Sequence, residues 1–93
     1  MTKLVKLVSV SVRSEFLVHL VFSDGSSGTI DFAPILAQDS ALTIPLRDAA
    51  RFGELFIDMG ALCWPIGLEF SAAGLQARLR DAGTLERDYS TAL

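Results

Sequence analysis

One stretch decides how this chain folds: residues 16–32, which read FLVHLVFSDGSSGTIDF. Apolar side chains recur at every second position over residues 16–22, which is the period of a half-buried β-strand. The Asp24-Gly25 pair lies between two β-rich runs and predicts a two-residue type I′ turn, because both residues tolerate positive φ. With a further strand over residues 28–32, the stretch predicts a β-hairpin.

A third strand is predicted just before this hairpin. Val8, Val10 and Val12 are apolar, whereas the residues between them are serines. This alternation is typical of a strand with one face toward the core. The first third of the chain is therefore built of strands.

Shorter elements follow the hairpin. Residues 33–37 resemble one helical turn, with Pro34 near its start. Asp48 can cap a short helix over residues 49–55, whose Phe52 and Phe56 would share one face. Two short strands, residues 56–58 and 61–64, are predicted around Met59-Gly60, and a last helix runs from a Ser71 cap to about Ala82 and stops at Gly83.

This order predicts a single small α+β domain over residues 1–83, arranged β(3)-α-β(2)-α. We expect one sheet with the helices packed on one face, followed by a C-terminal tail over residues 84–93. The predicted core consists of Val8, Val10, Phe16, Val18, Leu20, Phe22, Ile30, Phe52, Trp64, Leu75 and Leu79.

Composition excludes several classes of protein. A chain of 93 residues with 51% hydrophobic residues is too apolar for a disordered protein. Its net charge of -3 disfavours a nucleic-acid partner, which would need a basic face. A single cysteine forms no internal disulfide, so we expect the cytoplasm. No stretch is apolar enough for a spanning helix or shaped like a signal peptide, so no membrane association is expected.

The residues that could carry chemistry are few. His19 and Cys63 are the only histidine and cysteine, and no metal-ligand spacing is present. We therefore predict no catalytic residue, no cofactor and no metal. The candidate ligand or partner surface consists of three carboxylates and one aromatic residue: Asp31, Asp58, Glu69 and Trp64.

Four residues are predicted to shape turns: Asp24, Gly25, Pro65 and Gly67. Pro65 would end a strand by removing a main-chain donor, and Gly67 would permit the turn into the last helix. The Trp64-Pro65-x-Gly67 segment is therefore interpreted as a structural corner, with a pocket wall formed by Trp64 as the alternative.

Three segments taken together resemble a known family. They are Phe22-Ser23-Asp24-Gly25, PLRDAARF at residues 45–52 and WPIGLE at residues 64–69. In this order they are similar to a bacterial family of small domains of unknown function, number 2442, over about residues 4–82. The family pattern has W-P-N-G followed by x-D, and here Ile66 replaces the asparagine and Glu69 the aspartate.

The resemblance implies a β(3)-α-β(2)-α fold and names no catalytic residues. Some relatives carry a C-terminal helix-turn-helix, and some are encoded beside a small partner suspected of toxin–antitoxin function. The residues after Gly83 are too few for a helix-turn-helix, so a direct transcription-factor role is not expected.

Three functions remain open at this point. The favoured one is a non-enzymatic protein-interaction or regulatory module, such as an antitoxin-like partner of a small protein. The alternative is a small-molecule-binding or enzymatic domain that uses carboxylates near Trp64, and the third is a nucleic-acid-associated regulator. We also expect a homodimer, because one small core cannot absorb so much apolar surface. The tail is the favoured interface, and an open strand edge is the alternative.

Overall fold

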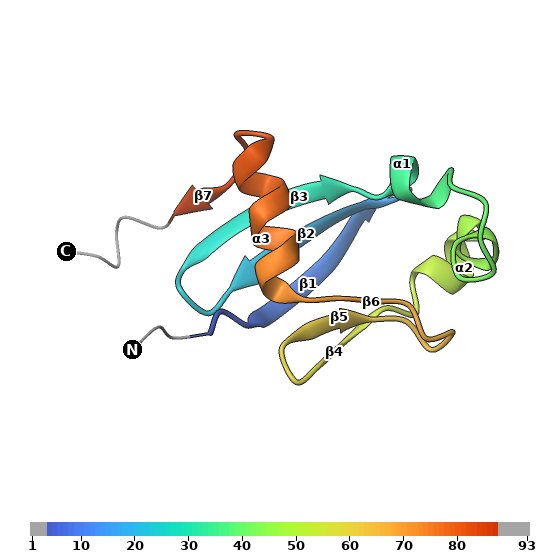
Figure 1. Ribbon diagram of the computed structural model, residues 1–93, viewed down its shortest axis with the longest axis horizontal. Coiled ribbons are helices and arrows are strands. Elements are labelled where there is room, and N and C mark those ends of the chain that lie inside the picture. Colours follow the sequence, from blue (N-terminus) through green and yellow to red (C-terminus); the bar gives the residue numbers. More distant parts are fainter. Residues whose placement is uncertain (1–3, 88–93) are drawn as a thin grey trace.

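The first sheet contains the predicted hairpin. A computed structural model describes residues 4–87. Strands β1 (Leu7–Ser14), β2 (Leu17–Phe22), β3 (Ser26–Asp31) and β7 (Glu86–Arg87) form an antiparallel sheet in the order β1-β2-β3-β7 (Figure 1). The start of the predicted tail thus contributes β7, which pairs with β3, whereas residues 88–93 lie outside the described part.

The remaining strands form a second sheet. Strands β4 (Phe56–Asp58), β5 (Ala61–Cys63) and β6 (Glu69–Phe70) are antiparallel in the order β4-β5-β6. The predicted α+β class is confirmed, but the structure has two sheets where one was expected. The reason is burial. Leu62 of β5 and the adjacent Trp64 pack into the same core as the first sheet. If these strands were instead added to the edge of the first sheet, the inner face of that sheet would stay uncovered.

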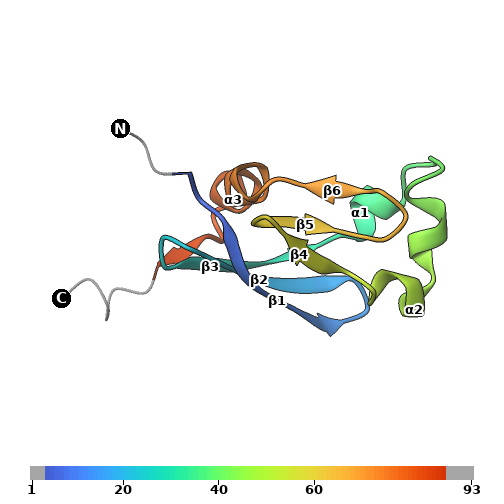
Figure 2. The same ribbon diagram turned by 90° about the horizontal axis from the view of Figure 1, so that it is seen from below.

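Short helical elements connect and cover the two sheets. They are α1 (Ala33–Leu36), the 3₁₀ helix η1 (Ile44–Arg47), α2 (Ala49–Phe52) and α3 (Ala72–Asp81). Figure 2 shows α3 and the second sheet on the same side of the first sheet, and no helix or strand within residues 4–87 covers the other face. Among residues 4–87, no helix has the length and apolar character needed to cross a membrane.

The helix ends follow the predicted caps with one exception. The Ser71 side chain accepts a hydrogen bond from the Gly74 N–H at 3.0 Å, and α3 ends before Gly83, whose φ is +74°. The predicted helix over residues 49–55 starts at Ala49 after the Asp48 cap, as expected, but it is shorter than predicted, because α2 stops at Phe52 and Phe56 lies in β4. Phe56 is exposed in its strand, so its spacing from Phe52 did not indicate a shared helical face.

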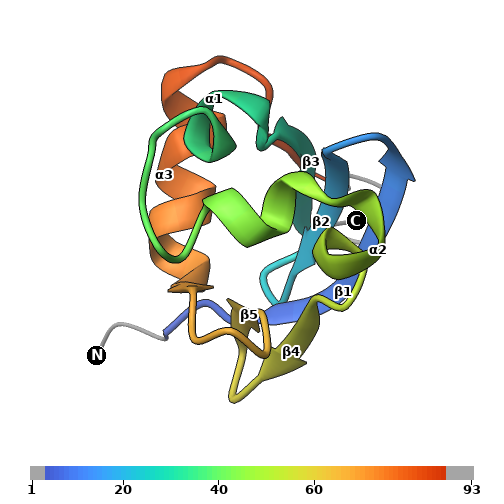
Figure 3. The same ribbon diagram turned by 90° about the vertical axis from the view of Figure 1, so that its right-hand side faces the viewer.

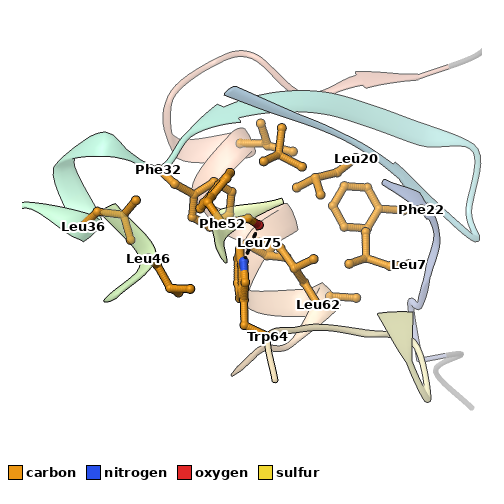
Figure 4. Packing of buried hydrophobic residues seen from close by; sticks show 13 residues of the cluster. Leu7, Leu20, Phe22, Phe32, Leu36, Leu46, Phe52, Leu62, Trp64 and Leu75 are labelled. Carbon is orange, nitrogen blue, oxygen red and sulfur yellow. Dashed lines mark hydrogen bonds between the residues drawn. The ribbon is translucent and has the colours of Figure 1, made fainter. Parts of the chain in front are cut away.

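The core lies between the two sheets and the helices (Figures 3 and 4). Most predicted core residues are buried there, whereas Val10, Phe16 and Ile30 are partly buried against it. Val8 is a wrong prediction, since its side chain is 57% exposed. The register of β1 against β2 shifts between Leu7 and Ser9, so a β-bulge at Val8 places Leu7 in the core instead.

The turn at Asp24-Gly25 exists but has a different geometry from the one predicted. The Gly25 N–H donates to the Phe22 carbonyl at 3.1 Å, and Gly25 alone has positive φ, at +88°. This is the pattern of a type I turn followed by a left-handed glycine. The reason is that the Asp24 carboxylate accepts a hydrogen bond from the Ser26 N–H at 3.0 Å, an Asx turn that favours ordinary φ at Asp24. The type I′ geometry occurs at Met59-Gly60, where φ is +50° and +81°.

We expect Gly25→Val to lower the free energy of unfolding by about 1–2 kcal/mol, because a β-branched side chain resists left-handed backbone. A Cβ added at Gly25 would meet no atom within 4 Å, so the loss reports backbone strain and not a clash. Urea denaturation measures it, with Gly53→Ala as control, since Gly53 has an ordinary φ of -68°. Equal unfolding midpoints for Gly25→Val and wild type would contradict the assignment.

Candidate functional site

Two of the three family-like segments meet in space and enclose a small depression. We call it the motif pocket, and its volume is about 230 Å³. One wall comes from residues 45–54 and the other from the turn after Trp64. Its lining residues are Pro45, Leu46, Arg51, Glu54, Pro65 and Ile66.

The first wall is held by η1 and α2. Leu46 is buried in the core and anchors η1 from below. The Arg47 side chain fixes η1 against the end of α1, because its Nε donates to the Leu36 carbonyl at 2.7 Å and its Nη2 contacts Asp39 Oδ1 at 2.7 Å. The Asp48 carboxylate accepts from the Ala50 N–H and starts α2, which carries Arg51. Local capping therefore sets the position of the charged rim.

The second wall is a turn between β5 and β6. The Gly67 N–H donates to the Trp64 carbonyl at 2.9 Å, and the Trp64 N–H donates to the Leu68 carbonyl at 2.9 Å. Gly67 has a φ of +109°, which supports its predicted role in a turn. The turn leads into β6, however, and not directly into the last helix as predicted. Ile66, at its tip, is 37% exposed.

Trp64 supports this turn from inside the core. Its side chain is 2% exposed, and its indole Nε1–H donates to the Phe52 carbonyl at 2.8 Å (Figure 4). The ring lies against Phe32, Phe52 and Phe70, with centroid separations of 5.7, 5.5 and 6.0 Å. The hydrogen bond joins the residue after β5 to the end of α2, so Trp64 connects the two walls of the motif pocket beneath its surface.

The chain matches the family described as "Protein of unknown function (DUF2442)" over residues 7–81. The chain belongs to this family. The match includes both walls of the motif pocket and all of the second sheet. No curated protein and no solved structure matched the chain.

The predicted carboxylates of this DUF2442 domain fall into two places. Asp58 on β4 and Glu69 on β6 flank Cys63 of β5, whose Sγ lies 3.9 Å from Glu69 Oε2. Burial raises the pKa of the Cys63 thiol, and the negative charges of Glu69 and Asp58 raise it further. The thiol is therefore protonated at neutral pH and a poor nucleophile. Within residues 4–87, no three His, Cys, Asp or Glu side chains gather as a metal site would require.

Asp31 lies in the other sheet, at a second groove of the DUF2442 domain. Its carboxylate accepts a hydrogen bond from the Ala33 N–H at 2.9 Å where α1 begins. The groove has a volume of about 310 Å³ and runs between the β3–α1 connection and α3. Arg78 lines it as well, and its guanidinium lies 5.9 Å from the centroid of the Phe70 ring. Arg78 was not among the candidate residues of the sequence analysis.

Asp24 is held by a polar network that sequence reasoning missed. Gln76 of α3 is buried, and its Nε2 donates to Asp24 Oδ2 at 2.8 Å and to Ser26 Oγ at 2.8 Å. The Ser26 hydroxyl donates to Asp24 Oδ1 at 2.6 Å. The pKa of Asp24 is lowered chiefly by this Ser26 hydroxyl, against a raising effect of desolvation, with smaller lowering contributions from the Ser26 N–H, Gln76 and Arg87. The network fastens the first hairpin to the last helix of the DUF2442 domain.

Proposed function

We propose that this DUF2442 domain is a non-enzymatic protein-interaction module, antitoxin-like or regulatory, whose motif pocket receives an apolar side chain of a small protein partner. One observation carries the proposal: the pocket joins two family-like segments that are separated along the chain, and apolar Ile66 stands exposed at its edge. Exposed apolar side chains beside a shaped depression are a feature of interaction surfaces.

The size and lining of the motif pocket support a side chain as its occupant. Its volume of about 230 Å³ is below the range of roughly 300–1,000 Å³ that is common for small-molecule pockets. Pro45, Pro65 and Ile66 provide apolar contact, whereas Arg51 and Glu54 add charges of both signs. An apolar centre with a polar rim is the usual anatomy of a protein interface.

The alternative function is a small-molecule-binding or enzymatic domain that uses carboxylates near Trp64. Ligand binding is favoured by the second groove, which is lined by the charged residues Asp31 and Arg78 together with apolar residues such as Ile35 and Leu79. The enzymatic form has less support, because the indole of Trp64 is buried and cannot form the wall of a pocket. A nucleic-acid-associated role is the third candidate, and the net charge of -3 gives it the least support.

A comparison of pocket variants tests the proposal. Affinity purification from extracts of the native cells uses wild type, Ile66→Glu and Met59→Glu, which changes a residue that is 93% exposed outside the pocket. We expect one small protein to be retained by wild type and Met59→Glu and lost with Ile66→Glu, because a buried charge opposes docking. The purified partner should then bind wild type at least tenfold more tightly than Ile66→Glu. Equal affinities for the two proteins would refute the motif pocket as the binding site.

The proposal also includes cytoplasmic localisation and self-association of the domain as a twofold dimer. The support for the dimer is the apolar surface that the fold leaves exposed, including Leu4, Val8, Val12 and Phe56. Of the two interfaces considered, the tail route depends partly on residues 88–93, which lie outside the described part. The strand-edge route depends on β1, which is fully described.

A further inference from the structure

Strand β1 forms an open edge of the first sheet. It is eight residues long, and within residues 4–87 it forms a hydrogen-bonded ladder with β2 only, while β4 packs near it without pairing. At the start of this edge, the Leu7 N–H donates to the Gly60 carbonyl at 2.9 Å. Beyond Leu7, no other residue within the described range 4–87 bonds to the outer main-chain groups of β1.

In an antiparallel sheet, successive residues of a strand direct their main-chain N–H and C=O groups to opposite sides, and this alternation shows which groups of β1 point outward. The Phe32 N–H donates to the Phe16 carbonyl at 2.9 Å, so the even-numbered residues of β2 bond toward β3 and the odd-numbered ones toward β1. The odd-numbered residues of β2 pair with Ser9 and Ser11. The outward Leu7 N–H follows the same alternation, because Leu7 pairs with an even-numbered residue of β2.

Val10 and Val12 are therefore the residues whose main-chain N–H and C=O groups face the open edge. Their side chains share the inner face of the sheet, because they pair with Leu20 and Val18, which are buried. Val12 is nevertheless 40% exposed, because no strand in the described part of the chain pairs with its outer side. The edge thus presents free hydrogen-bonding groups and apolar side chains at the same two positions.

The sequence of this edge is complementary to itself. Residues 10–12 read Val-Ser-Val, so an antiparallel copy centred on Ser11 places Val10 opposite Val12 of the second copy, and Val12 opposite its Val10. This register satisfies every outward main-chain group of both valines and packs their side chains together. It also sets Arg13 opposite Ser9 of the other copy and not opposite another arginine.

The usual protections of a sheet edge lie at the ends of β1 and not at its centre. Natural edges are blunted by lysine, proline or β-bulges. In β1 the register shifts lie at Val8 and Arg13, and the stretch between them contains neither charge nor proline. The undistorted centre of the strand is the part that the Ser11-centred register would use.

We propose that β1 is the seam of a twofold dimer, in which two copies of β1 pair antiparallel about Ser11 and join their sheets. The inference rests on the self-association included in the proposed function and names the surface that carries it. A twofold seam of this kind is isologous, because each copy contributes the same residues.

Engineered cysteines test the register directly. In the proposed seam, Ser11 faces Ser11 of the second copy as a non-hydrogen-bonded pair, with Cα atoms about 4.5 Å apart, a separation that a disulfide can span. Ser9→Cys is the matched control on the same face, since its two copies would be four residues out of register, or roughly 13 Å apart, too far for a disulfide. The native Cys63 is buried, and it is present in wild type and in both cysteine variants.

Under mild oxidation at low protein concentration, we expect most of the Ser11→Cys protein to become a covalent dimer that a reductant reverses. Ser9→Cys and wild type should remain monomeric on a denaturing gel. Cross-linking of Ser11→Cys at no more than the level of Ser9→Cys overturns the proposed register.

Light scattering separates failure of the seam from failure of self-association. We expect wild type at twice its chain mass of 10.0 kDa, and Val12→Arg at half the wild-type mass in solution. Leu42→Arg is the control, because Leu42 has a similar exposure of 39% but lies outside β1, and it should stay dimeric. If wild type is monomeric at every concentration, both self-association and the β1 seam are refuted. If wild type is a dimer and Val12→Arg is also a dimer, only the β1 seam is refuted.

Discussion

Replacing Trp64 by alanine is expected to lower the free energy of unfolding by about 3–5 kcal/mol. The indole is 2% exposed and contacts three phenylalanine rings, so truncation opens a cavity in the centre of the core. It also removes the hydrogen bond to the Phe52 carbonyl. Because a domain of this size is stable by only about 5–15 kcal/mol, the variant should be close to unfolding.

Far-UV circular dichroism in urea measures this loss, since Trp64 is the only tryptophan and its fluorescence disappears with it. Trp64→Phe keeps an aromatic ring but not the indole donor, and should cost about 1–3 kcal/mol. Met59→Ala changes an exposed residue and should stay within about 0.5 kcal/mol of wild type. If both Trp64 variants unfold at the same urea concentration as wild type, the packing and the hydrogen bond of the indole do not stabilise the core.

Replacing Asp24 by alanine is expected to destabilise the domain by about 1–3 kcal/mol at neutral pH. The change leaves the Gln76 amide without its carboxylate acceptor and the Ser26 hydroxyl without the group to which it donates. Gln76 is buried, so water replaces the lost acceptor poorly. Asp58→Ala removes an exposed carboxylate and is the matched control.

The loss should depend on pH. Because the pKa of Asp24 is lowered in the folded chain, the charged form stabilises the fold at neutral pH, and this stabilisation is lost as pH falls through the lowered pKa. Asp24→Asn keeps the shape of the side chain but cannot titrate. The stability difference between wild type and Asp24→Asn should therefore be constant from pH 7 to about 5 and shrink below about pH 4. A difference that is the same at pH 3 and pH 7 would show that the carboxylate charge has no role in the network.

Local patterns predicted the kind of element better than its exact form. The alternation in residues 16–22 predicted a strand because each side chain of a strand meets one face only, and β2 follows it. The same reasoning failed at Val8, because a β-bulge shifts the alternation without a clear sign in the sequence. Asp24-Gly25 predicted a turn but not its type, because the Asp24 side chain bonds to the chain two residues ahead.

The candidate site was predictable only in part. Pro65 and Gly67 were found because proline and glycine have backbone preferences that act locally. Trp64 was assigned to the core, but the use of its N–H was not foreseen, because the acceptor at Phe52 lies 12 residues away. Gln76 was missed altogether, since nothing near it in the chain indicates a partner 52 residues away.

The sequence by itself determined the α+β class, the caps of α2 and α3, the position of the hairpins and most of the core. Each of these features depends mainly on side chains that lie close together along the chain. Only the tertiary structure decided that the strands form two sheets, that residues 45–54 and 65–66 enclose one pocket, and that β1 keeps an open edge. The physical reason is that these features depend on which apolar faces share a core. That choice is settled by the total burial of the folded chain and not by any local preference.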